Sequence, residues 1–151
     1  MEIYEEYIEL KNKYKDASRE YDKVLEKKAR LYFSMEPKAV DISKERINGG
    51  KREDQFASFV ANLEEIDIEL NKARNERDLQ NYFLKKKELE LRESQEVINK
   101  IYAYRYIDRM KVKHIALKVH YGKTKIYEYI NEIEEKIEEM RSAEKNGKKV
   151  C

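Results

Sequence analysis

Apolar residues recur at alternating intervals of four and three along the start of this chain. The series is Ile3, Tyr7, Leu10, Tyr14, Ala17, Tyr21, Val24, Lys28 and Leu31, in which only Lys28 is charged. Such heptad spacing forms a narrow stripe along a helix and favours packing against another helix. We therefore expect an N-terminal heptad helix over residues 1–33. Its tyrosines suit a helix–helix seam that is partly exposed to solvent.

A second heptad series follows the only cluster of helix breakers in the sequence. Pro37, Gly49 and Gly50 lie in "SMEPKAVDISKERINGGKRED", which predicts a connector over 34–52, pinned by Ile42 and Ile47. The second series is Phe56, Phe59, Leu63, Ile66, Leu70 and Ala73, continued by Arg77, Gln80 and Leu84. We expect a central long helix over 53–93, antiparallel to the first.

Two questions about this second run stay open in the sequence. The polar stretch near Arg77 fits solvent exposure, a partner contact or a bend equally well. One helix or two could cover residues 53–109, since no Gly or Pro marks a break there.

The composition supports an all-α fold, a long coiled-coil-like helical arm followed by a C-terminal helix-turn-helix. The 151 residues include 4 Gly and 1 Pro, and 42% are charged. The single Cys, Cys151, excludes an internal disulfide and a four-ligand zinc site, and it suits a reducing cytoplasm. The N-terminus is not patterned as a signal peptide, and no apolar run is long enough to span a membrane.

Three helices can be read in the last third, and they predict a helix-turn-helix domain over 94–141. The first ends in "VINKIYAYRYIDRM", and the second, "KVKHIALKV", has Ile115, Ala116 and Val119 on one face. The third is expected from Lys123 to Arg141, followed by a disordered tail over 142–151. Its inward row is Ile126, Ile130, Ile133, Ile137 and Met140.

The three residues "HYG" between the second and third helices fit the tight turn of a helix-turn-helix. His120 stands where the backbone often adopts a positive φ, and His tolerates that conformation better than most side chains. Gly122 is an acceptable N-cap for the third helix, although a weaker one than Ser or Thr. Ala116 is small enough for the third helix to pass close by.

The distribution of charge indicates which end of the third helix would face DNA. Six cations and no acid lie between Arg109 and Lys125, whereas six Glu and one Lys lie between Glu128 and Glu139. A helix that is basic at its start and acidic beyond fits end-on docking in the major groove of double-stranded DNA. The base-reading candidates are Lys123, Thr124, Lys125, Tyr127 and Glu128, and the phosphate-contact candidates are Arg109, Lys111, Lys113 and Lys118.

The segment "RYIDRMKVKHIALKVHYGKTKIYEYI" resembles the sigma-factor region 4-like helix-turn-helix of phage-encoded RinA/ArpU-type transcriptional regulators. Arg105-Tyr106 and Ile115-Ala116 match the pairs that these proteins carry, and "DISKERINGGKRED" resembles their linker. Gly122 replaces their usual serine, and His120 their usual small turn residue. The resemblance implies a regulator of phage or prophage genes, with host RNA polymerase as a further partner to consider.

Other readings of these features stay open. The basic segment could be a solvated face, and the heptads could pack within the chain or join two chains into a homodimer. Two rivals are a small terminase-like DNA-packaging protein and a coiled-coil adaptor that does not bind DNA. His114 and His120 lack nearby metal ligands, and no nucleophile has a partner base, so we expect no enzyme, metal or cofactor.

Overall fold

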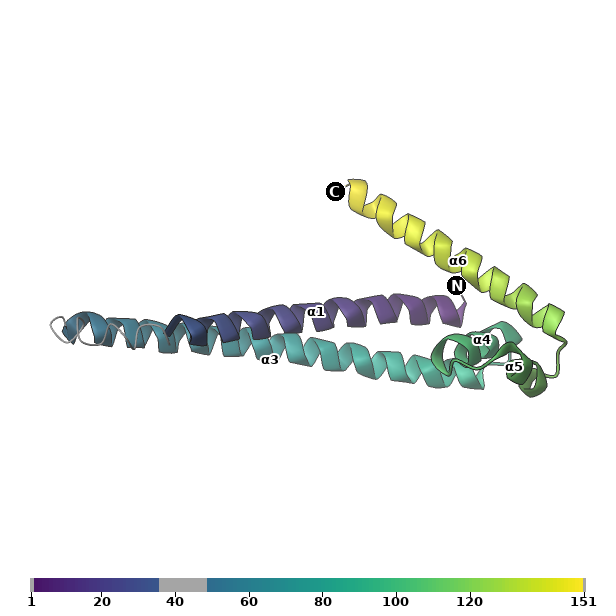
Figure 1. Ribbon diagram of the computed structural model, residues 1–151, viewed down its shortest axis with the longest axis horizontal. Coiled ribbons are helices and arrows are strands. Elements are labelled where there is room, and N and C mark those ends of the chain that lie inside the picture. Colours follow the sequence, from purple (N-terminus) through teal and green to yellow (C-terminus); the bar gives the residue numbers. More distant parts are fainter. Residues whose placement is uncertain (1, 36–48, 151) are drawn as a thin grey trace. The chain divides into compact units, whose positions relative to one another are not determined.

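The computed structural model describes residues 2–35 and 49–150, with side chains at 2–34 and 54–147 (Figure 1). These residues form five α-helices and one π-helical segment, with no strand among them, so the predicted all-α class is confirmed. Contacts group the chain into two compact units. Unit 1 comprises Met1–Lys11 with Tyr82–Cys151, and unit 2 comprises Asn12–Asn81.

Two long helices, α1 (Ile3–Met35) and α3 (Gly49–Glu93), contribute to both units. No Gly or Pro interrupts α1, and Glu5 and Glu6 in its first turn face the positive end of the helix dipole favourably. Every member of the first heptad series is buried or half-buried. The seam predicted from sequence is therefore the inward face of α1.

In unit 2 the two heptad series pack against each other within one chain. Val24 meets Leu70 and Ala73 in a small core. The charged member of the first series, Lys28, places its Nζ 2.8 Å from the Asp67 carboxylate, and this hydrogen bond raises the pKa of Lys28. Arg77 is half-buried with its guanidinium 4.2 Å from the centre of the Tyr21 ring. The polar stretch of α3 is thus a contact inside unit 2, and the helix continues through it.

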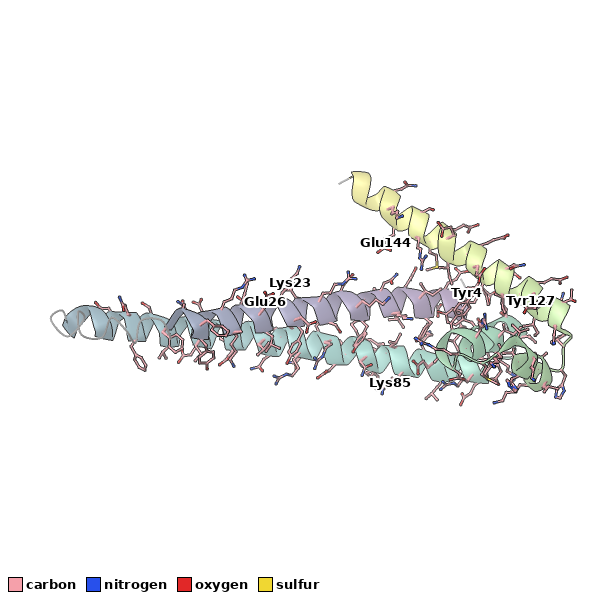
Figure 2. The ribbon with its side chains drawn as sticks, in the orientation of Figure 1. Tyr4, Lys23, Glu26, Lys85, Tyr127 and Glu144 are labelled. Carbon is pink, nitrogen blue, oxygen red and sulfur yellow. The ribbon has the colours of Figure 1, made fainter. Side chains whose placement is uncertain are left out.

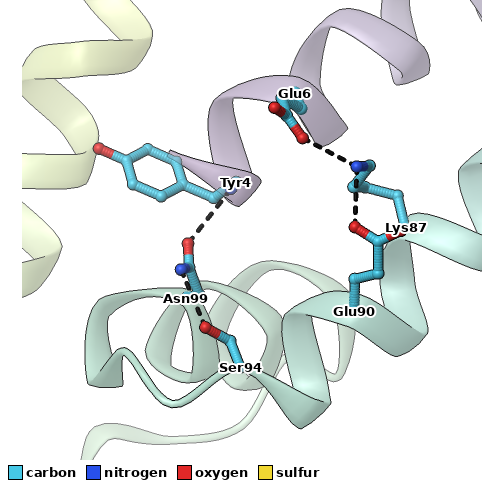
Figure 3. Close-up of polar contacts among 6 residues, drawn as sticks. All are labelled: Tyr4, Glu6, Lys87, Glu90, Ser94 and Asn99. Carbon is cyan, nitrogen blue, oxygen red and sulfur yellow. Dashed lines mark hydrogen bonds and ion pairs between the residues drawn. The ribbon is translucent and has the colours of Figure 1, made fainter. Parts of the chain in front are cut away.

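In unit 1 the start of α1 lies against the end of α3. Lys87 Nζ donates to carboxylate oxygens of Glu6 and Glu90, both at 2.8 Å (Figure 3). These two bonds raise the pKa of Lys87. Tyr7 Oη donates to the Glu88 carboxylate at 3.3 Å. Polar pairs at the edge of the seam therefore set the register of the two helices here.

The helix α3 ends at Glu93, and a new helix, α4 (Val97–Tyr102), begins after three residues. The Ser94 hydroxyl oxygen accepts a hydrogen bond from the Glu96 backbone N–H and another from Asn99 Nδ2, each at 3.2 Å. A local side-chain acceptor of this kind competes with helix continuation. Two helices rather than one therefore cover the run that the sequence left open.

The π-helix η2 (Ala103–Ile107) continues α4, and α5 (Val112–Val119) and α6 (Lys123–Val150) follow it. The unit 1 core is built from all of these elements, and its fully buried large side chains are Leu91, Ile101, Ile115, Ile126, Ile133 and Asn99. The inward row of α6 is buried or half-buried throughout. The apolar periodicity of the last third thus predicts the core that holds α4, α5 and α6 together.

Two predicted boundaries are wrong at the connector. Residues 34–35 belong to α1, and residues 49–52 belong to α3, so the connector predicted over 34–52 shrinks from both sides. Ile42 and Ile47 lie outside the described residues. Phe56 was expected in the seam but is 60% exposed. Phe59, three residues further on, meets Tyr32 near the end of α1, so Phe56 lies at the limit of the contact between the two helices.

The predicted ends of the helix-turn-helix domain also change. The disordered tail expected over 142–151 is wrong for residues 142–150, because α6 continues through Val150, and Cys151 lies outside the described residues. Ala143, Glu144 and the three Lys of this stretch are strong helix formers, and one Gly at 147 costs only about 1 kcal/mol. The domain is larger than 94–141 at its other side too, since unit 1 includes the start of α1 and the end of α3.

Candidate nucleic-acid interface

Two residues with left-handed backbone conformation frame α5. Arg109 precedes the helix with φ 55°, and His120 follows it with φ 60°. The Met110 N–H donates to the Tyr104 carbonyl at 2.9 Å, and the Tyr121 N–H donates to the Ala116 carbonyl at 3.3 Å. Such bonds satisfy the last carbonyls of a helix and turn the chain sharply. The positive φ predicted for His120 is confirmed.

One face of α5 is buried and the other is basic. Val112 and Ile115 are buried, and Ala116 and Val119 are half-buried, as the sequence predicted. The opposite face exposes Lys113, His114, Leu117 and Lys118. Because the apolar face is fixed against α4 and α6, the lysines are held outward.

The turn of three residues after α5 delivers the chain to the start of α6. The Gly122 carbonyl accepts a hydrogen bond from the Ile126 N–H at 3.2 Å, which places Gly122 at the N-cap position. Ile126 and Ile130 are buried at 0% and 5% exposure. These two anchors turn the remaining side chains of the first turns of α6 to solvent. The five exposed residues there are the base-reading candidates, Lys123, Thr124, Lys125, Tyr127 and Glu128.

We name the six cations between Arg109 and Lys125 the basic face. Its members, all exposed, are Arg109, Lys111, Lys113, Lys118, Lys123 and Lys125. The nearest acid before it, Asp108, is held by Arg92 Nη2 at 2.8 Å. The first acid beyond it, Glu128, lies 3.4 Å from Lys125 Nζ. The basic face therefore carries an excess of positive charge that a polyanion would relieve.

Two aromatic rings steady cations of the basic face, and sequence reasoning missed both. Lys118 Nζ lies 5.1 Å from the centre of the Tyr104 ring, and Lys125 Nζ lies 5.3 Å from that of Tyr129. An ammonium over a ring face is attracted by its quadrupole. The spacing of four between Lys125 and Tyr129 was a readable signal, because such pairs are neighbours on a helix. The contact of Tyr104 with Lys118 depends on η2, and no feature of the sequence predicts it.

Among the residues that the structure describes, no three His, Cys, Asp or Glu side chains are arranged to hold a metal ion. No described helix combines the length and apolarity needed to cross a bilayer.

Comparisons with protein family models, curated proteins and solved structures find no match to this chain. The likeness to RinA/ArpU-type regulators thus stays an expectation that depends on the motifs quoted above. Contact of each candidate residue with DNA also stays a prediction. The geometry adds that all nine candidates are exposed and that α5 and the start of α6 carry seven of them, while Arg109 and Lys111 directly precede α5.

Proposed function

We propose that this chain is a sequence-specific DNA-binding transcriptional regulator whose α6 docks by its N-terminal end in the major groove. One observation carries the proposal: the basic face lies on the segment from Arg109 to Lys125, which includes α5, the turn after it and the first turn of α6, and all six of its cations are exposed. Unpaired backbone N–H groups at a helix start add to the attraction for phosphate. Lys123, Thr124 and Lys125 would reach base edges there.

The acidic remainder of α6 favours end-on over lengthwise docking. Glu132, Glu134, Glu135, Glu138 and Glu139 are exposed along the helix beyond its first turns. A helix lying along the groove would bring these carboxylates close to phosphates, where like charges repel. Docking by the tip keeps them in solvent and brings only the basic face to the duplex.

Charge count gives the proposal a magnitude. A protein that neutralises Z phosphates releases counterions, and log K then falls against log salt with a slope of about −0.9Z. If the six members of the basic face each meet a phosphate or a base edge next to one, the slope is about −5. Binding through one or two incidental lysines would give a much shallower dependence.

The biological setting of the proposal comes from the resemblance stated for the helix-turn-helix. We propose regulation of phage or prophage genes in the bacterial cytoplasm, with host RNA polymerase as a second partner. A homodimer through the helical arm would present two such tips, because one small motif buries little surface on DNA.

Selection of bound fragments from a random DNA pool by the full chain tests this function. We expect one enriched motif, bound at least about a hundredfold more tightly than unselected DNA. A terminase-like protein would instead form a large ring, which light scattering separates from a dimer. If no fragment is retained even at low salt, the proposal fails and the adaptor function gains support.

A further inference from the structure

The helix α3 exposes large apolar side chains on the face opposite its seam. Ile68, Leu79, Tyr82 and Leu89 are 57%, 47%, 62% and 58% exposed. Each of these four lies two residues after a position of the inward heptad register, which half-buried Lys87 continues three residues after Leu84. Two residues correspond to about 200° around a helix. They share this outer face with Asn75 and the exposed Ala61.

The corresponding face of α1 is different. From Glu9 onward, the positions two residues beyond its seam are Glu9, Asn12, Asp16, Arg19, Lys23, Glu26, Arg30 and Phe33, of which only Phe33, at the end of the helix and 66% exposed, is apolar. Lys23 and Glu26 project from α1 on the side away from α3 (Figure 2). Such a polar face is an ordinary solvated surface. The apolar outer stripe of α3 is therefore not a general property of the helical arm, and exposed stripes of this kind mark interaction sites.

Charges along the outer face of α3 reverse sign about Asn75. Glu64 and Lys86 each lie 11 residues from Asn75, Glu65 and Lys85 each lie 10, and Lys72 and Asp78 each lie 3. All six side chains are exposed, and Lys85 projects on the side of α3 away from α1 (Figure 2). The face is thus complementary in charge to a copy of itself that runs in the opposite direction.

We infer that this outer face of α3 binds the same face of a second copy, antiparallel, with Asn75 on the two-fold axis. A two-fold interface is self-complementary, so the three charge pairs form twice. A parallel pair in register would instead oppose Lys72 to Lys72 and Glu65 to Glu65. A polar Asn within an apolar seam is a known means of fixing register.

The inference deepens the homodimer of the proposed function but does not need DNA binding. Ile68 and Tyr82, each seven residues from Asn75, would pack across the interface, and Ala61 would meet Leu89. Their side chains are exposed in the single chain, so pairing removes apolar surface from water. Assembly and DNA binding are measured separately, so failure of one is distinguishable from failure of the other.

Sedimentation equilibrium of the full chain at about 100 µM tests the surface. We expect a dimer for the wild type and a monomer of unchanged helicity for Ile68→Glu/Leu79→Glu. Leu25→Glu is the matched control, since Leu25 is 44% exposed on α1, and it should stay dimeric. A monomeric wild type, or a dimer that survives the double substitution, would overturn the proposal.

A charge exchange tests the complementarity. Glu64→Lys and Lys86→Glu should each weaken dimerisation about tenfold, because each opposes like charges twice. The double variant should recover most of the wild-type affinity, since the pairs re-form with exchanged signs. Equal weakening in the double variant would contradict the assigned pairing.

Disulfide formation tests the orientation, in a Cys151→Ser background. Asn75→Cys should cross-link two chains, because the residue meets its own copy on the axis. Ile68→Cys should not, since the two copies of residue 68 would be about 21 Å apart along the helices. A cross-link at residue 68 would show a parallel pair and overturn the antiparallel arrangement.

Discussion

The buried amide of Asn99 joins the first turn of α1 to α4 through Tyr4. Asn99 Oδ1 accepts a hydrogen bond from the Tyr4 backbone N–H at 3.2 Å, and Asn99 Nδ2 donates to Ser94 Oγ at 3.2 Å (Figure 3). Asn99 has no exposed surface. Two segments that lie 95 residues apart in sequence are therefore joined by one side chain.

Asn99→Ala should destabilise the chain by about 2–3 kcal/mol, because it breaks both bonds and leaves a cavity. Urea unfolding followed by circular dichroism measures this free energy. Asn131→Ala, at an exposed position of α6, is the matched control and should change stability by less than about 0.5 kcal/mol. Equal effects of the two substitutions would contradict the role given to Asn99.

The two histidines should respond oppositely to replacement by glycine. His120 has φ 60°, a conformation that costs an L-residue about 1 kcal/mol or more, so His120→Gly should raise stability by about that amount. His114 is exposed within α5, where His114→Gly should lower stability by about 0.5–1 kcal/mol. Thermal unfolding of both variants checks the signs. A loss of stability in His120→Gly would show that the turn needs the imidazole.

Alkaline pH should weaken unit 1 through its tyrosines. Burial, with nearby carboxylates of Glu5 and Glu88, raises the pKa of Tyr4 and of Tyr7 to about 12. Tyrosine in an unfolded chain titrates near about pH 10. The folded state thus holds its protons more tightly, so this contribution is complete below about pH 10 and is lost as pH rises toward about 12.

Unfolding free energies measured in steps from about pH 8 to pH 11.5 should stay level and then fall steeply. Tyr7→Phe should reduce the slope of that fall, since it removes one of the titrating groups. Constant stability across the alkaline range, with the chain still folded, would contradict the burial of the cluster.

Glu128 should reduce the attraction of the basic face for DNA. It lies 3.4 Å from Lys125 Nζ and offsets part of that charge. Glu128→Gln should tighten binding to unselected DNA about twofold, the size expected for an exposed pair. Glu144→Gln, on the same helix and also exposed, is the control and should have no effect. Weaker binding confined to the selected site would instead identify Glu128 as a base-reading residue.

The spacing of apolar residues and the residue types at turns were sufficient to predict much of this fold. The heptad intervals of α1 identify its inward face because a buried stripe must repeat with the helix. His120 was predictable as a turn residue because few side chains other than Gly, Asn, Asp and His adopt positive φ. The exposed start of α6 followed from the positions of Ile126 and Ile130, which leave Lys123 and Lys125 on the opposite side.

Other features have no local signature. Ser94 ends α3 by accepting two hydrogen bonds, one of them from a side chain five residues on, so no Gly or Pro was needed. The π-helix η2 changes the register of Tyr104 relative to α5, and single-turn insertions of this kind are set by packing. The contact between Tyr104 and Lys118 depends on that register, so it could not be predicted from spacing alone.

The salt dependence of DNA binding tests the central proposal most directly. Fluorescence anisotropy of a labelled selected fragment gives log K against log salt for the wild type, for Lys123→Ala/Lys125→Ala and for the control Lys23→Ala/Lys145→Ala. Both control residues are exposed and lie outside the basic face. We predict a wild-type slope of about −5, which becomes shallower by about 2 in the first variant and is unchanged in the control. Equal slopes and affinities for all three proteins would contradict docking by the start of α6.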